Sequence, residues 1–118
     1  MKSVTIAFDC DGTLLNNTQQ QMVANECIRS LLVTLASFKN THIVVWSGGG
    51  ELYARQVAAA LGVQKYVDSY AGKNPQRTVG VTETASRHVF KPDIEPDIAI
   101  DDIQDCNLGK INLIVREK

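Results

Sequence analysis

Two pairs of acidic residues stand where apolar stretches of the sequence end. Asp9 and Asp11 follow the first apolar stretch, and Asp101 and Asp102 follow a later one. Like charges about 4 Å apart repel by roughly 4 kcal/mol at an effective dielectric of about 20, so clustered carboxylates either take up protons or bind a cation. Oxygen ligands without a histidine or cysteine partner favour magnesium over zinc. If the fold brings the two pairs together, the sequence predicts a Mg²⁺ site.

A phosphate site is expected beside this metal. Ser47 and Gly48 begin a short break between an apolar stretch and an amphipathic one, where free backbone N–H groups at the start of a helix attract anions. Lys91, shortly before the second acidic pair, would add a positive charge, and Lys73 competes with it for this role. With the Asp9 carboxylate as nucleophile, these groups describe a centre for phosphoryl transfer.

Several other common sites do not fit the spacing. Counted from Asp9, glycine falls at the fourth place of an EF-hand loop instead of the sixth, and Gln20 stands where that loop requires glutamate. The glycines 48–50 lack the third glycine of a dinucleotide fingerprint, and no Walker-type phosphate loop occurs. The three cysteines form no C-x-x-C pair, so neither a disulfide framework nor a zinc site is indicated.

The hydrophobic pattern predicts strands that alternate with helices. Strands are expected at 4–8, 42–46, 66–69, 97–102 and 111–115, and helices at 19–38 and 51–61, whereas 71–88 give no clear pattern. Such alternation is typical of parallel strands joined by right-handed crossovers over both faces of a sheet. The predicted fold class is α/β: a single Rossmann-like domain over residues 1–118, with three α/β/α layers and a mainly parallel five-stranded sheet. In such a sheet the first and fourth strands can be neighbours.

Size and composition exclude several classes of protein. A chain of 118 residues suits one compact core, and a net charge of −1 gives no general attraction to nucleic acid or to acidic membranes. No apolar stretch approaches the roughly 20 residues of a membrane helix, and no secretion signal is apparent. We therefore expect a cytoplasmic protein without a membrane partner.

The order of these stretches resembles the haloacid dehalogenase (HAD) superfamily of phosphohydrolases. Residues 8–14 (FDCDGTL) resemble the first family motif, hhhDxDGT, and residues 44–48 (VVWSG) resemble the second, an apolar strand that ends in Ser or Thr. Lys91 resembles the third motif, and residues 98–102 (IAIDD) resemble the fourth. The resemblance covers nearly the whole chain and implies a HAD-like fold with Mg²⁺-dependent phosphatase activity.

The resemblance also implies a role for each acidic residue. Asp9 would attack phosphorus to form an aspartyl phosphate, and Asp11 would protonate the leaving oxygen and then activate the hydrolytic water. Asp9 and Asp101 would bind Mg²⁺ through their carboxylates and Asp11 through its backbone carbonyl, with Asp102 or Asp105 assisting. An aspartate at position 11 fits the phosphatases of the superfamily.

The same resemblance addresses the substrate. Ser47, Gly48 and Lys91 would hold the phosphate oxygens. Only a few residues separate the first motif from the first helix, and about forty join Ser47 to Lys91, so no cap domain is expected. An open site suits a large or end-presented phosphate, such as a nucleic-acid end or a sugar phosphate, unless a second subunit covers it. A surplus of basic residues in 65–91 leaves nucleic acid open as a partner. Monomer and homo-oligomer both remain open.

Three other interpretations are compatible with parts of this pattern. Asp-Gly after a strand is often only a turn, although the distant acidic pair argues against that interpretation here. A phospho-acceptor regulator would use Asp9 alone and would not need Asp11. A catalytically silent binding domain would keep the fold but would not require the full set of polar residues.

Overall fold

The structure is a computed structural model that describes residues 3–16, 22–73, 95–103 and 107–116. Its strands and helices are β1 (Val4–Asp9), α1 (Glu26–Ala36), β2 (Thr41–Ser47), α2 (Glu51–Leu61), the 3₁₀ helix η1 (Gln64–Tyr66), β3 (Ser69–Gly72), β4 (Ile98–Asp101) and β5 (Ile111–Ile114). None of the helices in these ranges has the length and apolar character needed to cross a membrane.

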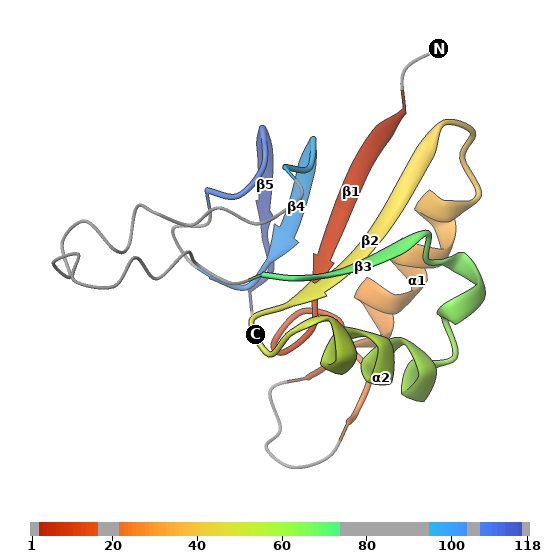
Figure 1. The fold of residues 1–118 in the computed structure, drawn as a ribbon, viewed down its shortest axis with the longest axis vertical. Coiled ribbons are helices and arrows are strands. Elements are labelled where there is room, and N and C mark those ends of the chain that lie inside the picture. The colour runs from red at the N-terminus through yellow and green to blue at the C-terminus, as the bar shows by residue number, and fades with distance from the viewer. Residues whose placement is uncertain (1–2, 17–21, 74–94, 104–106, 117–118) are drawn as a thin grey trace, which may run out of the picture.

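The five strands form one sheet in the order β3-β2-β1-β4-β5, and all neighbouring pairs are parallel. The α/β fold class and the parallel sheet are therefore confirmed. β1 lies at the centre, with Phe8 paired to Val45 of β2 and to Ile100 of β4. Because all strands run the same way, the residues at the ends of β1 and β4 meet at one edge of the sheet (Figure 1).

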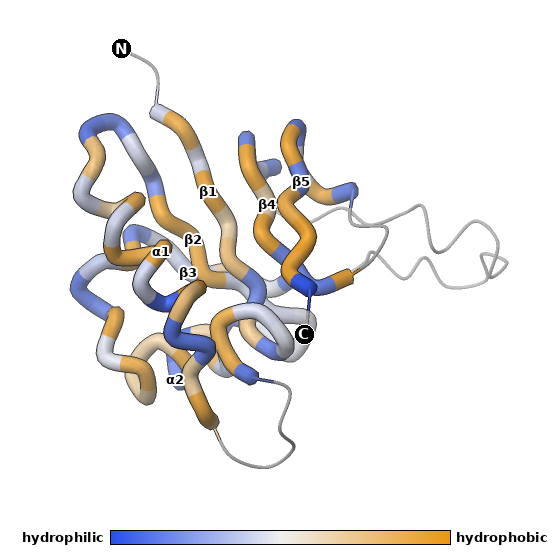
Figure 2. Tube along the Cα trace, turned by 180° about the vertical axis from the view of Figure 1, so that it is seen from behind, coloured by the Kyte–Doolittle hydropathy of each residue, from blue (hydrophilic) through white to orange (hydrophobic). Residues whose placement is uncertain are grey.

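Both described helices pack on one face of this sheet. Leu32 of α1 and Val57 of α2 belong to the same buried cluster as Phe8 and Val45. A smaller buried cluster, which includes Trp46, lies on the opposite face, as the alternation of side chains along a strand requires. Figure 2 shows that the middle parts of β1 and β4 are hydrophobic. No helix on that second face is found among the described residues, so the three-layer arrangement stays a prediction.

Two elements begin three or more residues later than predicted. α1 begins at Glu26 instead of residue 19, because Ala24 pairs with Leu15 and the backbone N–H of Asn16 donates to the carbonyl of Val23 at 2.7 Å. Backbone groups engaged in this pairing cannot also form helical hydrogen bonds. Residues 17–21, where the first part of the helix was predicted, lie outside the described ranges.

The third strand begins three residues later than predicted. Residues 64–66 form the η1 turn instead. After this turn, the first hydrogen bond with β2 is made by Asp68, whose carboxylate accepts a hydrogen bond of 2.8 Å from the backbone N–H of Ile43. The β3 strand then runs from Ser69 to Gly72. This shift matters for the site, because it places residue 73 directly after the strand end.

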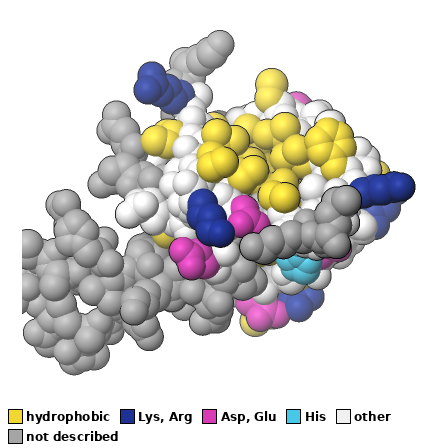
Figure 3. Space-filling model, turned by 90° about the horizontal axis from the view of Figure 1, so that it is seen from above, with side chains coloured by type: hydrophobic (Ala, Val, Ile, Leu, Met, Phe, Trp, Pro, Cys, Tyr) yellow, Lys and Arg dark blue, Asp and Glu magenta, His cyan; other side chains and the backbone are white. Residues whose placement is uncertain are grey.

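Within the described ranges, neither helix covers the β4 and β5 part of the helix-bearing face. α1 and α2 lie on the β2 side of the sheet, and β4 and β5 stand apart from both helices (Figure 1). Ile111 and Leu113 of β5 are 55% and 47% exposed. Figure 3, seen from above, shows hydrophobic side chains gathered on the surface.

Candidate active site

Three carboxylates converge at the edge of the sheet where β1 and β4 end. Asp9 is the last residue of β1, Asp101 is the last residue of β4, and Asp102 follows directly. One oxygen of each lies within 4.8 Å of the others. Asp9 and Asp101 are buried, whereas Asp102 is exposed. Of the two acidic pairs that the sequence predicts to meet here, Asp9, Asp101 and Asp102 thus converge, whereas the carboxylate of Asp11 does not join them.

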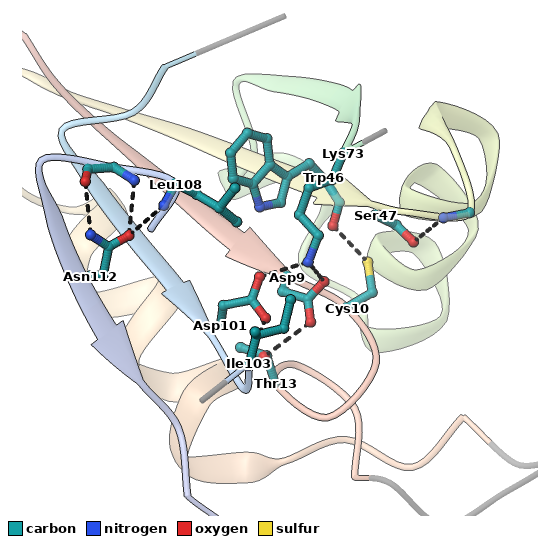
Figure 4. A network of polar contacts seen from close by, with 12 residues as sticks. Asp9, Cys10, Thr13, Trp46, Ser47, Lys73, Asp101, Ile103, Leu108 and Asn112 are labelled. Atoms are coloured by element: carbon teal, nitrogen blue, oxygen red, sulfur yellow. Dashed lines mark hydrogen bonds and ion pairs between the residues drawn. The ribbon is translucent and has the colours of Figure 1, made fainter. Parts of the chain in front are cut away.

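Lys73 bridges the two buried carboxylates. Its Nζ lies 2.8 Å from Oδ1 of Asp9 and 2.6 Å from Oδ2 of Asp101 (Figure 4). Lys73 follows β3 at the edge of the sheet, so its side chain extends past β2 to reach β1 and β4. Its backbone N–H donates to the carbonyl of Ser47 at 2.7 Å, which fixes the start of that side chain. The site is therefore assembled from four strand ends.

The close approach of these ionisable side chains shifts their pKa values. Burial, together with the negative charges of Asp101 and Asp102, raises the pKa of Asp9 to about 7, although Lys73 opposes the shift. The pKa of Asp102 is also raised, first by burial and then by its contact with Asp101. Burial alone would lower the pKa of Lys73, but the two carboxylates raise it above the usual lysine value. The centre is therefore one in which an added cation would relieve repulsion.

Contacts from the neighbouring loops complete the site. The hydroxyl of Thr13 donates to Oδ2 of Asp9 at 3.3 Å, and the backbone N–H of Ile103 donates to Oδ1 of Asp101 at 3.1 Å. Gly12 has a φ of +80°, and a Cβ at this position would collide with the carboxylate of Asp102. A glycine is therefore required here, both for the turn and for the close approach of Asp102.

Asp11 lies apart from the three carboxylates. It is exposed, and none of its oxygens belongs to the group formed by Asp9, Asp101 and Asp102. Instead, Oδ1 of Asp11 accepts a hydrogen bond of 2.6 Å from the hydroxyl of Tyr53 in α2. The carboxylate thus lies on the surface, two residues along the chain from Asp9, with the Tyr53 hydroxyl as its partner.

Ser47 is the last residue of β2, one residue beyond the expected strand end, and Gly48 begins the connection from β2 to α2. Ser47 is buried, and its Oγ accepts a hydrogen bond of 2.9 Å from the backbone N–H of Gly49. Gly48 is exposed. Gly50 precedes α2 with a φ of +104°, a conformation that suits glycine. The hydroxyl proton of Ser47 remains available for an acceptor, because Oγ serves as the acceptor in the bond to Gly49.

Two predicted site residues fall outside the described ranges. These are Lys91 and Asp105. Lys73, the other lysine weighed from the sequence, lies against the carboxylates of Asp9 and Asp101. Thr13 and Tyr53 were not assigned roles from the sequence. Thr13 belongs to the first motif and could have been noticed there, but no local pattern relates Tyr53 to Asp11, since the two residues are 42 positions apart.

Comparison of the chain with protein-family models, with curated proteins and with solved structures gives no match.

Proposed function

We propose that this protein is a Mg²⁺-dependent phosphatase that hydrolyses phosphate monoesters through an aspartyl phosphate on Asp9. The observation that carries the proposal is the grouping of three carboxylates within 4.8 Å of one another, two of which contact a buried lysine ammonium. Clustered acids next to a cation at the carboxyl ends of parallel strands are suited to binding a metal and a phosphate together. The sequence motifs around Asp9 and Asp101 support the same conclusion.

The donor set fits a magnesium ion. Asp9, Asp101 and Asp102 offer only carboxylate oxygens, which are the ligands that Mg²⁺ prefers, and burial together with the charges of the other two carboxylates raises the pKa of Asp9. These three residues would hold the ion, with the backbone carbonyl of Asp11. When bound, the ion would neutralise charge on the phosphate and favour the ionised form of Asp9.

The residues of the chain account for both steps of the reaction. A carboxylate oxygen of Asp9 attacks phosphorus, and the bond from phosphorus to the ester oxygen breaks as Asp11 gives that oxygen a proton. In the second step Asp11 takes a proton from water, the water oxygen attacks phosphorus, and inorganic phosphate leaves with Asp9 regenerated. The Lys73 ammonium and the Ser47 hydroxyl offset the charge that develops on the phosphate oxygens.

We further propose that the fold is that of the HAD superfamily, with a second layer of helices completing the Rossmann-like domain. The order β3-β2-β1-β4-β5, with the nucleophile on the central strand, supports this assignment. The short connection between β1 and α1 supports an open site without a cap there, suited to a large or end-presented phosphate such as a nucleic-acid end or a sugar phosphate. The proposed location is cytoplasmic.

The proposal is tested by hydrolysis of para-nitrophenyl phosphate with and without Mg²⁺. We expect activity that is lost in excess chelator and in Asp9→Asn. The matched control is Asp68→Asn, at the opposite end of the sheet, where the amide oxygen can still accept the hydrogen bond from Ile43. Activity that persists in Asp9→Asn would refute the nucleophile. A stable aspartyl phosphate that forms from a small phosphodonor without turnover would instead favour a phospho-acceptor regulator.

A further inference from the structure

Tyr53 connects the loop after β1 with the beginning of α2. It lies in the first turn of α2, and its hydroxyl donates a hydrogen bond of 2.6 Å to Oδ1 of Asp11. This contact brings together the first motif and the segment that follows the second motif. The proposed reaction uses Asp11 as its acid and base, so the group that holds this carboxylate bears directly on proton transfer.

The ring of Tyr53 is itself held in place. It packs against the main hydrophobic core, and a Cβ added at Gly49 would lie 3.4 Å from its Cδ2 atom, so the ring rests against that glycine. A phenol ring anchored in this way has little freedom to rotate. The hydroxyl is therefore directed at Asp11 by the packing of α2.

The hydrogen bond is compatible with both protonation states of Asp11. A tyrosine hydroxyl keeps its proton at neutral pH, so the phenol of Tyr53 remains a donor. With Oδ1 engaged as an acceptor, the mobile proton of Asp11 is placed on Oδ2. A carboxyl group protonated on Oδ2 still accepts through Oδ1, so the bond is kept while Oδ2 gives or takes a proton.

We infer that Tyr53 is a positioning residue that holds the Asp11 carboxyl for proton transfer to the leaving oxygen. The inference rests on the proposed phosphatase function. Because Asp11 is exposed, its side chain would sample several rotamers without this partner. Oδ2 would then face the leaving oxygen for only part of the time, and the contribution of the acid would fall.

The test uses Tyr53→Phe, which keeps the ring and removes the hydroxyl. The kcat/KM value reports steps up to release of the first product, so it depends on protonation of the leaving oxygen only when that oxygen is a poor leaving group. We expect kcat/KM to fall about tenfold for an alkyl phosphate and to change less than about twofold for 2,4-dinitrophenyl phosphate. A merely structural role would lower both values equally.

Two further variants sharpen the result. In an Asp11→Asn background, where no acid remains to be positioned, we expect Tyr53→Phe to have no additional effect on the alkyl ester. The control is Leu52→Ala, the neighbouring residue in the same turn, whose side chain is 76% exposed. It should leave both esters unchanged, and thermal unfolding should show that all variants are folded.

The outcomes separate this inference from the proposed function. If the wild-type protein hydrolyses the esters and Asp9→Asn does not, but Tyr53→Phe affects both esters equally or neither, only the role of Tyr53 is refuted. If the wild-type protein hydrolyses no ester, the phosphatase proposal fails, and the role of Tyr53 fails with it.

Discussion

Lys73 and Asp9 are 64 residues apart in the sequence, yet Nζ of Lys73 lies 2.8 Å from Oδ1 of Asp9. Both side chains are 7% exposed, and the same ammonium also contacts Asp101. A buried charge is tolerated only when it is paired, so this contact holds the ends of three strands together as well as shaping the site. Removal of the Lys73 ammonium should therefore affect both stability and activity.

Lys73→Met tests the structural contribution of this ammonium. The substitution leaves two buried carboxylates without a counter-charge, and breaking a buried pair in this way costs about 3 kcal/mol. We expect the free energy of unfolding, measured with urea at pH 8 in chelator, to fall by about that amount. Added Mg²⁺ should restore part of it, because a bound cation takes over the neutralisation.

The control for this measurement is Lys65→Met. Lys65 is exposed, and its ammonium lies 5.2 Å from the centre of the Tyr66 ring, a contact worth less than about 1 kcal/mol. Equal losses of stability in Lys65→Met and Lys73→Met would contradict a stabilising role of the ion pairs that Lys73 forms.

Activity distinguishes the two lysines proposed from the sequence. Because Lys73 touches Asp9 directly, we expect Lys73→Ala to lower kcat by more than about 100-fold, the scale seen when a group that stabilises transition-state charge is removed. Lys91→Ala should have a much smaller effect. If the larger loss is found in Lys91→Ala, Lys91 is the phosphate-binding lysine and Lys73 is structural.

The raised pKa of Asp9 predicts an unusual dependence of stability on pH. In the unfolded chain this carboxyl loses its proton near its ordinary pKa of 3.8, whereas in the folded protein it keeps the proton up to a pKa of about 7. Between these values the folded state binds more protons, so the contribution of Asp9 to stability falls as the pH rises. Lys73 does not titrate in this range. We expect the loss, on the order of 2 kcal/mol, in chelator between pH 4.5 and pH 8.

Asp9→Asn provides the comparison for this prediction. It removes the titrating group, so in chelator the variant should be more stable than the wild-type protein at pH 8, with the difference shrinking toward pH 5. Mg²⁺ should stabilise the wild-type protein more at pH 8 than at pH 5, because it binds the ionised carboxylates. Trp46, the only tryptophan of the chain and the β2 partner of Asp9, offers a fluorescence signal for the titration. A wild-type stability that rises with pH relative to Asp9→Asn would contradict the raised pKa.

Much of the site followed from local patterns in the sequence. An apolar stretch that ends in acids marks both a buried strand and the edge where ligands bind, so Asp9, Asp101 and Asp102 were found together. Lys91 was preferred to Lys73 because its position shortly before the second acidic pair resembles the third family motif, and the third strand was expected to end at Ser69. The strand in fact continues to Gly72, which carries Lys73 to the site.

The remaining differences arise from contacts between distant segments. The first helix was predicted to begin too early because Met22 and Val23 match its hydrophobic period, although the pairing of Ala24 with Leu15 keeps this segment extended. The hydrogen bond from Tyr53 to Asp11 likewise depends on where α2 packs on the sheet. Periodicity describes one element at a time and cannot indicate such pairings.

Gly12→Ala tests the geometry of the loop after β1. Gly12 has a φ of +80°, which strains any residue with a Cβ, and the added methyl group would collide with the carboxylate of Asp102. We expect a loss of about 2 kcal/mol in the free energy of unfolding and a higher Mg²⁺ concentration for half-maximal activity, since Asp102 must move. The control for stability is Gly48→Ala, where, apart from the two chain neighbours, no atom of the described residues lies within 4 Å of the new Cβ. Unchanged stability and unchanged Mg²⁺ dependence in Gly12→Ala would show that Asp102 does not approach this loop as the structure places it.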